Sequence, residues 1–359
     1  MEVRAAIHPD EEKSVGQITR VGVDLAKSVF HVHGVDRHGA CQWQAKLKRD
    51  GWIAALSERV PAGATIAMEA CASAHHWGRE LQRRGYRVQL IAAQFVKPFV
   101  KGNKNDRNDA LAITEAMVRP DMRFVAVKTS VQQDLQAVHR IREELVKQRT
   151  AKANQIRALV GEYGIVAPAG IAHLRRAIPC WLEDAENGLS ETFRVLLREL
   201  QEDLQGLDDR VKAQDERIAR QARQDPVVQR LMSLRGVGAL SATALSVALG
   251  DGRAFGRGRD FAASLGLVPG QHSTGGRERL LGITKRGDPY LRKLLVHGAR
   301  AVIRHAKHRD DELSRWVNAL VARKHVNVAT VALANKTARM AWALAHGGAE
   351  YDPALAAAG

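Results

Sequence analysis

The stretch Thr19-Arg20-Val21-Gly22-Val23-Asp24 decides the fold of the first third of this 359-residue chain. Its apolar residues predict a β-strand that ends in a carboxylate, and Leu25-Ala26-Lys27-Ser28 joins it to a second predicted strand, Val29–Val35. Asp36-Arg37-His38-Gly39 predicts a turn, after which Cys41–Lys48 alternates between apolar and polar residues as a third strand does. Three consecutive strands therefore open the fold.

The segments that follow alternate between helix and strand. The pattern predicts the following elements: a helix over Trp52–Arg59, a strand over Thr65–Glu69, a helix over His76–Arg84, a strand over Arg87–Ala92, and helical pieces over Gln94–Val100 and Asp106–Val118. A sheet of this kind, with helices packed on it, is a mixed α/β domain. We expect it to cover residues 17–125.

From about Thr129 the pattern changes to long helices. One helical stripe runs from Leu135 to Val160, and a second runs from Leu197 to Ile218. The two stripes predict an antiparallel coiled-coil arm, and an ordinary helical bundle arm fits the same spacing.

The whole chain is expected to divide at the ends of these patterns. The expected parts are a flexible N-terminus (1–16), the α/β domain (17–125), the helical arm (126–225), a mostly α-helical C-terminal domain with glycine-rich turns (226–350) and a tail (351–359).

Charge indicates the kind of partner. Lys and Arg number 55 against 39 Asp and Glu, which gives a formal net charge of +16 that is spread along the chain. This excess indicates a polyanion, most naturally nucleic acid, although a merely solvated basic protein is the alternative. Three distant cysteines, the lack of a signal peptide and the lack of a long apolar run predict a cytoplasmic protein with no membrane partner.

Four carboxylates form a candidate metal site. Asp24 and Glu69 each end a predicted strand, while Asp106 and Asp109 lie three residues apart and share one face at the start of a helix. Carboxylates distributed in this way could hold two Mg²⁺ (or Mn²⁺) ions that act on a phosphodiester. The alternative is structural, with Asp106 as an N-cap and Asp109 in the first helical turn.

The C-terminal third contains two glycine-rich motifs. Leu234-Arg235-Gly236-Val237-Gly238 has the shape of a helix-hairpin-helix turn, in which Gly236 and Gly238 let backbone amides approach a phosphate; a plain interhelical turn is the alternative. Gln271-His272-Ser273-Thr274-Gly275-Gly276 predicts a flexible loop that presents a serine to a phosphate, close to arginines. From the residues alone, a DNA-clamping surface loop with an inert hydroxyl is the preferred interpretation.

Several of these motifs resemble one known family. Gly22-Val23-Asp24-Leu25-Ala26-Lys27 and Asn105-Asp106-Arg107-Asn108-Asp109-Ala110 resemble the DEDD insertion-sequence transposases, the IS-one-ten family, and within it the IS-eleven-eleven group. Gly266-Leu267-Val268-Pro269, His272–Gly276 and Ile283–Asp288 are similar to the C-terminal transposase domain of that family. The resemblance implies a RuvC-type, RNase H-like N-terminal domain.

The resemblance also implies a function. The protein would be a DNA transposase or recombinase, in which Asp24, Glu69, Asp106 and Asp109 bind metal and Ser273 forms a transient phosphoserine link to DNA. Thr274 is the alternative register for that serine. Partners would be donor and target DNA, a guide (bridge) RNA and further copies of the chain in a dimer or tetramer, in a bacterial cytoplasm at the nucleoid.

Basic residues near both motif sets are expected to contact the nucleic acid. They are Lys27, Lys104, Arg107, Arg277, Arg279, Lys285, Arg286 and Arg292, together with the glycines Gly236 and Gly238. Two alternatives remain for the activity. One is a Holliday-junction resolvase or structure-specific nuclease that uses only the carboxylates, and the other is a non-catalytic DNA-binding protein.

Overall fold

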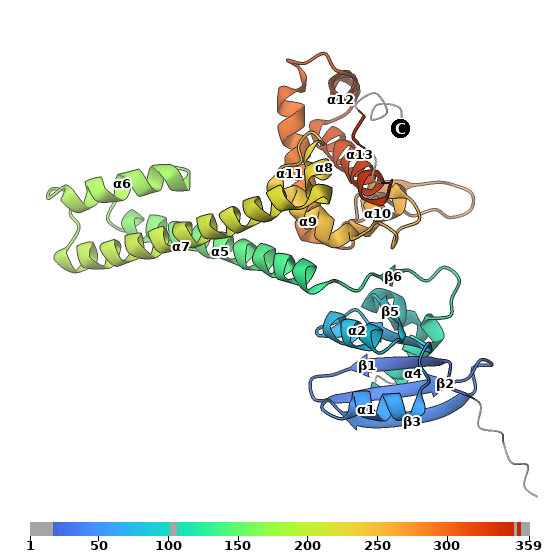
Figure 1. The fold of residues 1–359 in the computed structure, drawn as a ribbon. Helices are drawn as coiled ribbons and strands as arrows, with labels where there is room; N and C mark the ends of the chain where they lie inside the picture. The colour runs from blue at the N-terminus through green and yellow to red at the C-terminus, as the bar shows by residue number, and fades with distance from the viewer. Residues whose placement is uncertain (1–16, 101–105, 348–349, 353–359) are drawn as a thin grey trace, which may run out of the picture. The chain divides into compact units, whose positions relative to one another are not determined.

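The computed structural model describes residues 17–100, 106–347 and 350–352, and of Asp106 it describes the backbone alone. The chain divides into two compact units, Met1–Thr129 and Ser130–Gly359, which are described separately (Figure 1). The expected flexible N-terminus and most of the expected tail lie outside the described residues. No helix in the described part combines the length and the hydrophobicity that crossing a membrane requires.

The first unit contains a mixed six-stranded sheet in the order β3-β2-β1-β4-β5-β6. Its strands are β1 (Arg20–Leu25), β2 (Val29–Val35), β3 (Cys41–Lys48), β4 (Thr65–Glu69), β5 (Arg87–Ile91) and β6 (Phe124–Val125). β1, β2 and β3 are antiparallel neighbours, whereas β1, β4 and β5 run parallel. The mixed α/β prediction is confirmed. The two-residue strand β6, antiparallel to β5, was not predicted because a strand so short has no sequence pattern.

Helices cover both faces of this sheet. They are α1 (Trp52–Arg59), α2 (Ala74–Arg83), α3 (Ala93–Val96), the 3₁₀ helix η1 (Lys97–Phe99) and α4 (Asp106–Ala116). On one face the rings of Phe30, Trp52 and Trp77 meet edge to face, with centroids 5.1 to 5.5 Å apart. This aromatic contact anchors α1 and α2 to β2.

The opposite face of β1 carries α4 at very close range. A Cβ atom on Gly22 would lie 2.3 Å from Thr114 Oγ1 and 2.4 Å from the Ala110 carbonyl oxygen. Only glycine therefore fits at position 22, because any side chain would overlap the helix backbone. Around this contact Ala67, Ile91 and Ile113 form a small core between α4 and the sheet.

The second unit begins with a helical arm. The arm consists of α5 (Ser130–Gly161), α6 (Ile171–Glu183) and α7 (Glu191–Gln224) (Figure 1). α5 and α7 pack along each other in opposite directions, since ion pairs join Arg142 to Asp215 and Lys152 to Asp203. Ser190 caps α7, where its Oγ accepts a hydrogen bond from the Phe193 amide at 3.1 Å. Helix α6 was not predicted, because Pro179 lies inside it and a glycine- and proline-rich stretch precedes it.

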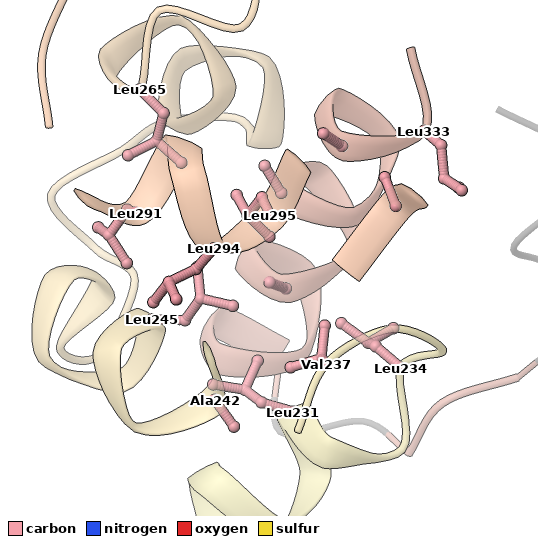
Figure 2. Packing of buried hydrophobic residues seen from close by; sticks show 14 of the residues in the cluster. Leu231, Leu234, Val237, Ala242, Leu245, Leu265, Leu291, Leu294, Leu295 and Leu333 are labelled. Atoms are coloured by element: carbon pink, nitrogen blue, oxygen red, sulfur yellow. The ribbon is translucent and has the colours of Figure 1, made fainter. Parts of the chain in front are cut away.

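The remainder of the second unit is mostly helical around one large apolar core. Its elements are α8 (Pro226–Met232), α9 (Ala239–Leu249), α10 (Gly258–Ser264), β7 (Pro269–Gln271), β8 (Leu280–Ile283), α11 (Pro289–Ala306), α12 (Glu312–Arg323) and α13 (Val326–Gly347). Figure 2 shows Leu231, Leu245, Leu295 and Leu333 converging in this core from α8, α9, α11 and α13.

A buried histidine joins the arm to this core. His139 of α5 lies 2.9 Å from Tyr290 Oη through Nδ1 and 3.0 Å from Thr243 Oγ1 through Nε2. Thr243 Oγ1 itself donates to the Ala239 carbonyl at 2.7 Å, so it accepts from His139 Nε2–H, and Tyr290 donates to Nδ1. Burial, followed by the charge of Arg142, lowers the pKa of His139 to about 4. The contact therefore requires a neutral imidazole.

Candidate functional site

Asp24 and Glu69 lie side by side at one edge of the sheet. In the parallel pair of β1 and β4, Gly22 is opposite Ala67 and Val23 is opposite Met68. Strand alternation then puts Asp24 and Glu69 next to each other on the face that α4 covers. The pKa of the Cys71 thiol is raised by burial and then by the charges of Glu69 and Asp24, as expected when both carboxylates are near it.

Helix α4 starts at Asp106 above the same face. The backbone contact between Ala110 and Gly22 fixes its first turns on β1, and Thr114 Oγ1 lies 3.1 Å from Nδ1 of His33 on β2. Asp109, which directly precedes Ala110, is half-buried. The structure thus brings Asp24, Glu69 and the helix that carries Asp109 to one face of the sheet.

The donor set suits a hard divalent cation. Asp24, Glu69 and Asp109 offer only carboxylate oxygens, which are ligands that Mg²⁺ and Mn²⁺ prefer. Among the residues with described side chains, no three or more His, Cys, Asp or Glu are grouped as metal ligands. The residues with described side chains do not include Asp106, the fourth expected carboxylate.

A basic groove adjoins the carboxylates. Arg107 Nη2 donates to Gln44 Oε1 at 2.6 Å, and both residues line a cavity of about 340 Å³ together with His31 and Lys46. His31 is the partner of Asp24 in the pairing of β2 with β1, so the groove lies close to the Asp24 end of the sheet.

The two other basic residues expected near the carboxylates are less informative. Lys27 is exposed in the turn after β1, where its carbonyl accepts a hydrogen bond from Arg49 Nη1 at 3.3 Å. Lys104 lies outside the described residues.

Ser273 lies in a β-hairpin, two residues after the end of β7. β7 pairs with β8, and a further bridge joins Thr274 to Arg277 across the two glycines at the tip. Gly275 and Gly276 both have positive φ, +57° and +77°, which a two-residue type I′ turn demands. The glycines that were interpreted as flexibility therefore form a tight turn. A Gly-Gly pair between two short runs was the signal that could have revealed it.

The hairpin register separates Ser273 from the arginines beside the turn. Gln271 is opposite Leu280 and Thr274 is opposite Arg277, so Ser273 is opposite Glu278. Strand alternation then gives Ser273 the same face as Gln271 and Glu278. Gln271 Nε2 donates to Ser273 Oγ at 2.9 Å.

The other face of the hairpin holds the alternative hydroxyl. Thr274 shares that face with His272, Arg277 and Arg279. The sequence did not predict that Ser273 and Thr274 lie on opposite faces, or that Gln271 and Glu278 are neighbours of Ser273. These features depend on how the two strands pair, which neither strand shows by itself.

Of the remaining basic residues, Arg292 supports the loop that follows the hairpin. Arg292 Nη1 donates to the carbonyls of Leu265 at 2.9 Å and Arg286 at 3.1 Å. A Cβ on Gly287 would overlap the Ser264 carbonyl oxygen, so the two backbones touch there. The Arg292 guanidinium thus holds the loop, whereas Lys285 and Arg286 are exposed.

The helix-hairpin-helix-like motif has a packing role at its first glycine. Gly236, with φ +80°, lies against α11, where its Cβ would be 2.7 Å from the Gly298 carbonyl oxygen. Gly238 is exposed and precedes the first residue of α9, and a Cβ there would meet nothing within 4 Å. Both expected phosphate-contacting glycines are exposed, but only Gly238 has room for a Cβ.

Comparison with known proteins connects the two halves of the chain. Residues 21–165 match the family of DEDD transposases of the IS110 type, and residues 228–314 match the transposase family IS116/IS110/IS902. The probable family 20 transposase of Pseudomonas aeruginosa is 48% identical over 328 residues, which are 91% of this chain and 96% of that protein.

Two further relatives are named after insertion sequences. The transposase for insertion sequence element IS1111A of Coxiella burnetii is 42% identical over 95% of this chain and 93% of its own length. The transposase for IS1328 of Yersinia enterocolitica is 40% identical over 93% of this chain and 99% of its own length. With matches of this extent, the chain belongs to the IS110/IS116/IS902 family of insertion-sequence transposases, and its N-terminal part is the DEDD domain of that family.

Proposed function

We propose that this transposase cuts and rejoins DNA strands in a metal-dependent reaction that passes through a covalent phosphoserine. The observation that carries the proposal is the meeting of Asp24 and Glu69 on adjacent strands beneath the helix that begins at Asp106. An RNase H-like, RuvC-type domain with this strand order accounts for that meeting.

Four carboxylates would hold the metal ions, namely Asp24, Glu69, Asp106 and Asp109. Bound Mg²⁺ or Mn²⁺ would polarise the scissile phosphate and offset the charge that develops on it. Arg107, held by Gln44, would bind the neighbouring backbone from the groove. Lys27 and Lys104 are proposed to contact the same strand.

Ser273 is the proposed nucleophile. Its Oγ attacks phosphorus, the bond between phosphorus and the 3′ oxygen breaks, and the 3′ hydroxyl leaves with a proton, so the DNA 5′ end becomes a phosphoserine. A free 3′ hydroxyl of another strand then attacks that phosphorus and releases the serine, which needs no high-energy cofactor. The hydrogen bond from Gln271 supports this assignment, because it fixes the Ser273 oxygen and leaves its proton free to depart.

Further basic residues and partners complete the proposal. Arg277, Arg279, Lys285, Arg286 and Arg292 would lie near the DNA backbone, with Gly236 and Gly238 in a helix-hairpin-helix-like turn. A guide (bridge) RNA that joins donor and target DNA is proposed from the family resemblance, and the net charge of +16 agrees with two nucleic-acid partners. The antiparallel pair of α5 and α7 is proposed to be a coiled-coil arm that joins copies into a dimer or tetramer.

A matched pair of hairpin variants tests the serine. Purified protein is incubated with labelled donor DNA, RNA of the element and Mg²⁺, and covalent protein–DNA adducts are separated under denaturing conditions. Ser273→Ala should abolish the adduct, whereas Thr274→Ala should retain it, because the two hydroxyls lie on opposite faces of the hairpin. Loss of the adduct in Thr274→Ala alone would move the nucleophile to Thr274.

A carboxylate variant separates the proposal from its alternatives. Asp24→Asn should abolish strand cleavage. Cleavage that needs Asp24 but survives Ser273→Ala would favour a resolvase or structure-specific nuclease. Cleavage that survives both changes would overturn the mechanism.

A further inference from the structure

Helix α11 is free of acidic residues along its whole length. Between Asp288, which caps its start, and Asp310, the chain has six Lys or Arg residues and three His residues and no Asp or Glu. A helix at the protein surface ordinarily carries both acidic and basic residues, because oppositely charged side chains three or four residues apart stabilise it. α11 has no such pairs within the helix.

The exposed side chains gather on one face. Lys293, His297, Arg300, Arg304 and His308 follow one another at intervals of three or four residues and are all exposed; we call them the basic stripe. The opposite face of α11 is buried in the core through Leu291, Leu295 and Val302, among others. From Lys293 to Arg304 the stripe is straight and roughly 16 Å long, at 1.5 Å per residue.

Most of the stripe has no protein partner. Lys293 pairs with Glu143 of α5 at 2.5 Å, but Arg300 and Arg304 have no ion pair or hydrogen bond among the residues that the structure describes. The nearest acidic residues along the chain are already paired, Asp310 with Arg315 and Asp311 with Arg235. Neighbouring cations one helical turn apart repel each other, so an external anion would stabilise them.

The backbone beneath the stripe is fixed. Gly298 packs on Gly236 so closely that a Cβ would lie 2.1 Å from the Gly236 carbonyl oxygen. α11 therefore presents its cations from a rigid element, which reduces the entropy lost on binding.

We propose that the basic stripe binds the phosphodiester backbone of duplex DNA. The stripe contains no Phe, Tyr or Trp, the large rings that single-stranded binders use to stack unpaired bases, and its cations follow one straight helix face, so a duplex backbone fits it better. The inference rests on the proposed function only in that the substrate is DNA; it requires neither the carboxylates nor Ser273.

Salt-dependent binding tests the proposal. The full chain is titrated onto a fluorescent DNA duplex with EDTA present, and the logarithm of the affinity is plotted against that of the salt concentration. Each phosphate contact contributes about 0.9 to the slope, so Arg300→Gln/Arg304→Gln should reduce the slope by nearly 2 and weaken binding about tenfold. Arg300→Lys/Arg304→Lys should preserve the slope, because charge alone determines it.

A control with the same charge change lies on α7. Arg198 and Arg210 are exposed beside Glu199, Glu202 and Asp209, and Arg198→Gln/Arg210→Gln should leave the slope unchanged. An equal loss in both double variants, or no loss in the stripe variant, would overturn the proposal. If only binding to single-stranded RNA changes, the stripe is an RNA site and the assignment to duplex DNA is wrong.

Formation of the serine adduct separates this proposal from the proposed function. If the unaltered chain binds through the stripe but forms no serine adduct, the proposed function fails and the stripe assignment stands. Thermal unfolding of Arg300→Gln/Arg304→Gln and Arg198→Gln/Arg210→Gln is followed by circular dichroism, so that a folding defect in either variant is detected independently of binding.

Discussion

The arm and helix α11 belong to one unit but use their charges in opposite ways. α5 and α7 carry both acidic and basic residues, and pairs such as Arg142–Asp215 and Arg149–Asp208 join the two helices. On α11 the exposed charges have one sign, and Arg300 and Arg304 find no counter-charge in the described part of the chain. Positive charge is therefore not equally available along the second unit: on the arm cations pair with acidic neighbours, whereas on α11 they are exposed to solvent.

The strongest test of this contrast removes a shared carboxylate from the arm. The Asp208 side chain is only 10% exposed. Its Oδ1 lies 3.0 Å from Arg149 Nη1 and its Oδ2 lies 3.1 Å from Arg175 Nη1, and the geometry of the second contact is not that of a hydrogen bond. Asp208→Ala would leave two arginines without their common counter-charge, so the free energy of unfolding should fall by about 3 kcal/mol in urea denaturation.

Asp203→Ala is the matched control for Asp208. The Asp203 carboxylate is 61% exposed and pairs with Lys152 at 2.9 Å, so its loss should cost less than about 1 kcal/mol. Equal effects of the two changes would show that the arm does not depend on its buried ion pairs.

A second test addresses the junction between the arm and the C-terminal helices through pH. In the unfolded chain the pKa of His139 is near 6.5, whereas burial lowers it to about 4 in the folded chain. Between these values the unfolded chain binds more protons, so the free energy of unfolding decreases as pH falls from 6.5 towards 4. The loss should reach about 2 kcal/mol by about pH 5, measured as a fall in Tm relative to neutral pH.

Variants with one histidine fewer isolate this contribution. His139→Gln should flatten the pH dependence between pH 6.5 and 4, while His297→Gln, at an exposed position of the basic stripe, should leave it unchanged. An unaltered pH profile in His139→Gln would show that other groups control the acid sensitivity of the unit.

The smallest effect on stability is expected on α11. Arg300→Gln/Arg304→Gln should change the free energy of unfolding by less than about 0.5 kcal/mol, and in the stabilising direction, because it removes a repulsion between cations four residues apart. A destabilisation above 1 kcal/mol in urea would mean that these arginines support the fold after all.

Local patterns predicted the sheet well and the contacts between distant segments poorly. Val29–Val35, Cys41–Lys48 and Thr65–Glu69 were predicted at their observed limits, because turn residues flank each strand. Asp24 and Glu69 were each predicted to end a strand, and they lie on neighbouring strands, at the last residue but one of β1 and the last residue of β4.

What the sequence did not reveal depends on partners far along the chain. Gly236 packs against Gly298, more than sixty residues away, a contact that its own motif does not reveal and that leaves its expected approach to a phosphate a prediction. The hydrogen bonds from the Arg292 guanidinium to the carbonyls of Leu265 and Arg286 were likewise not predicted, while its expected contact with nucleic acid stays a prediction. The placement of Ser273 and Thr274 on opposite faces of the hairpin follows from the pairing of its two strands, which cannot be read from either strand alone.

The bare backbone at Gly22 has a consequence for how the DEDD domain can vary. Because α4 rests on main-chain atoms there, its height above β1 is set by atomic radii and not by the packing of neighbouring side chains. A smaller side chain in the surrounding core, such as at Ile113, would leave a cavity there but could not bring the helix closer to β1. The contact at Gly22 thus sets a lower limit on the distance between β1 and the helix that begins at Asp106.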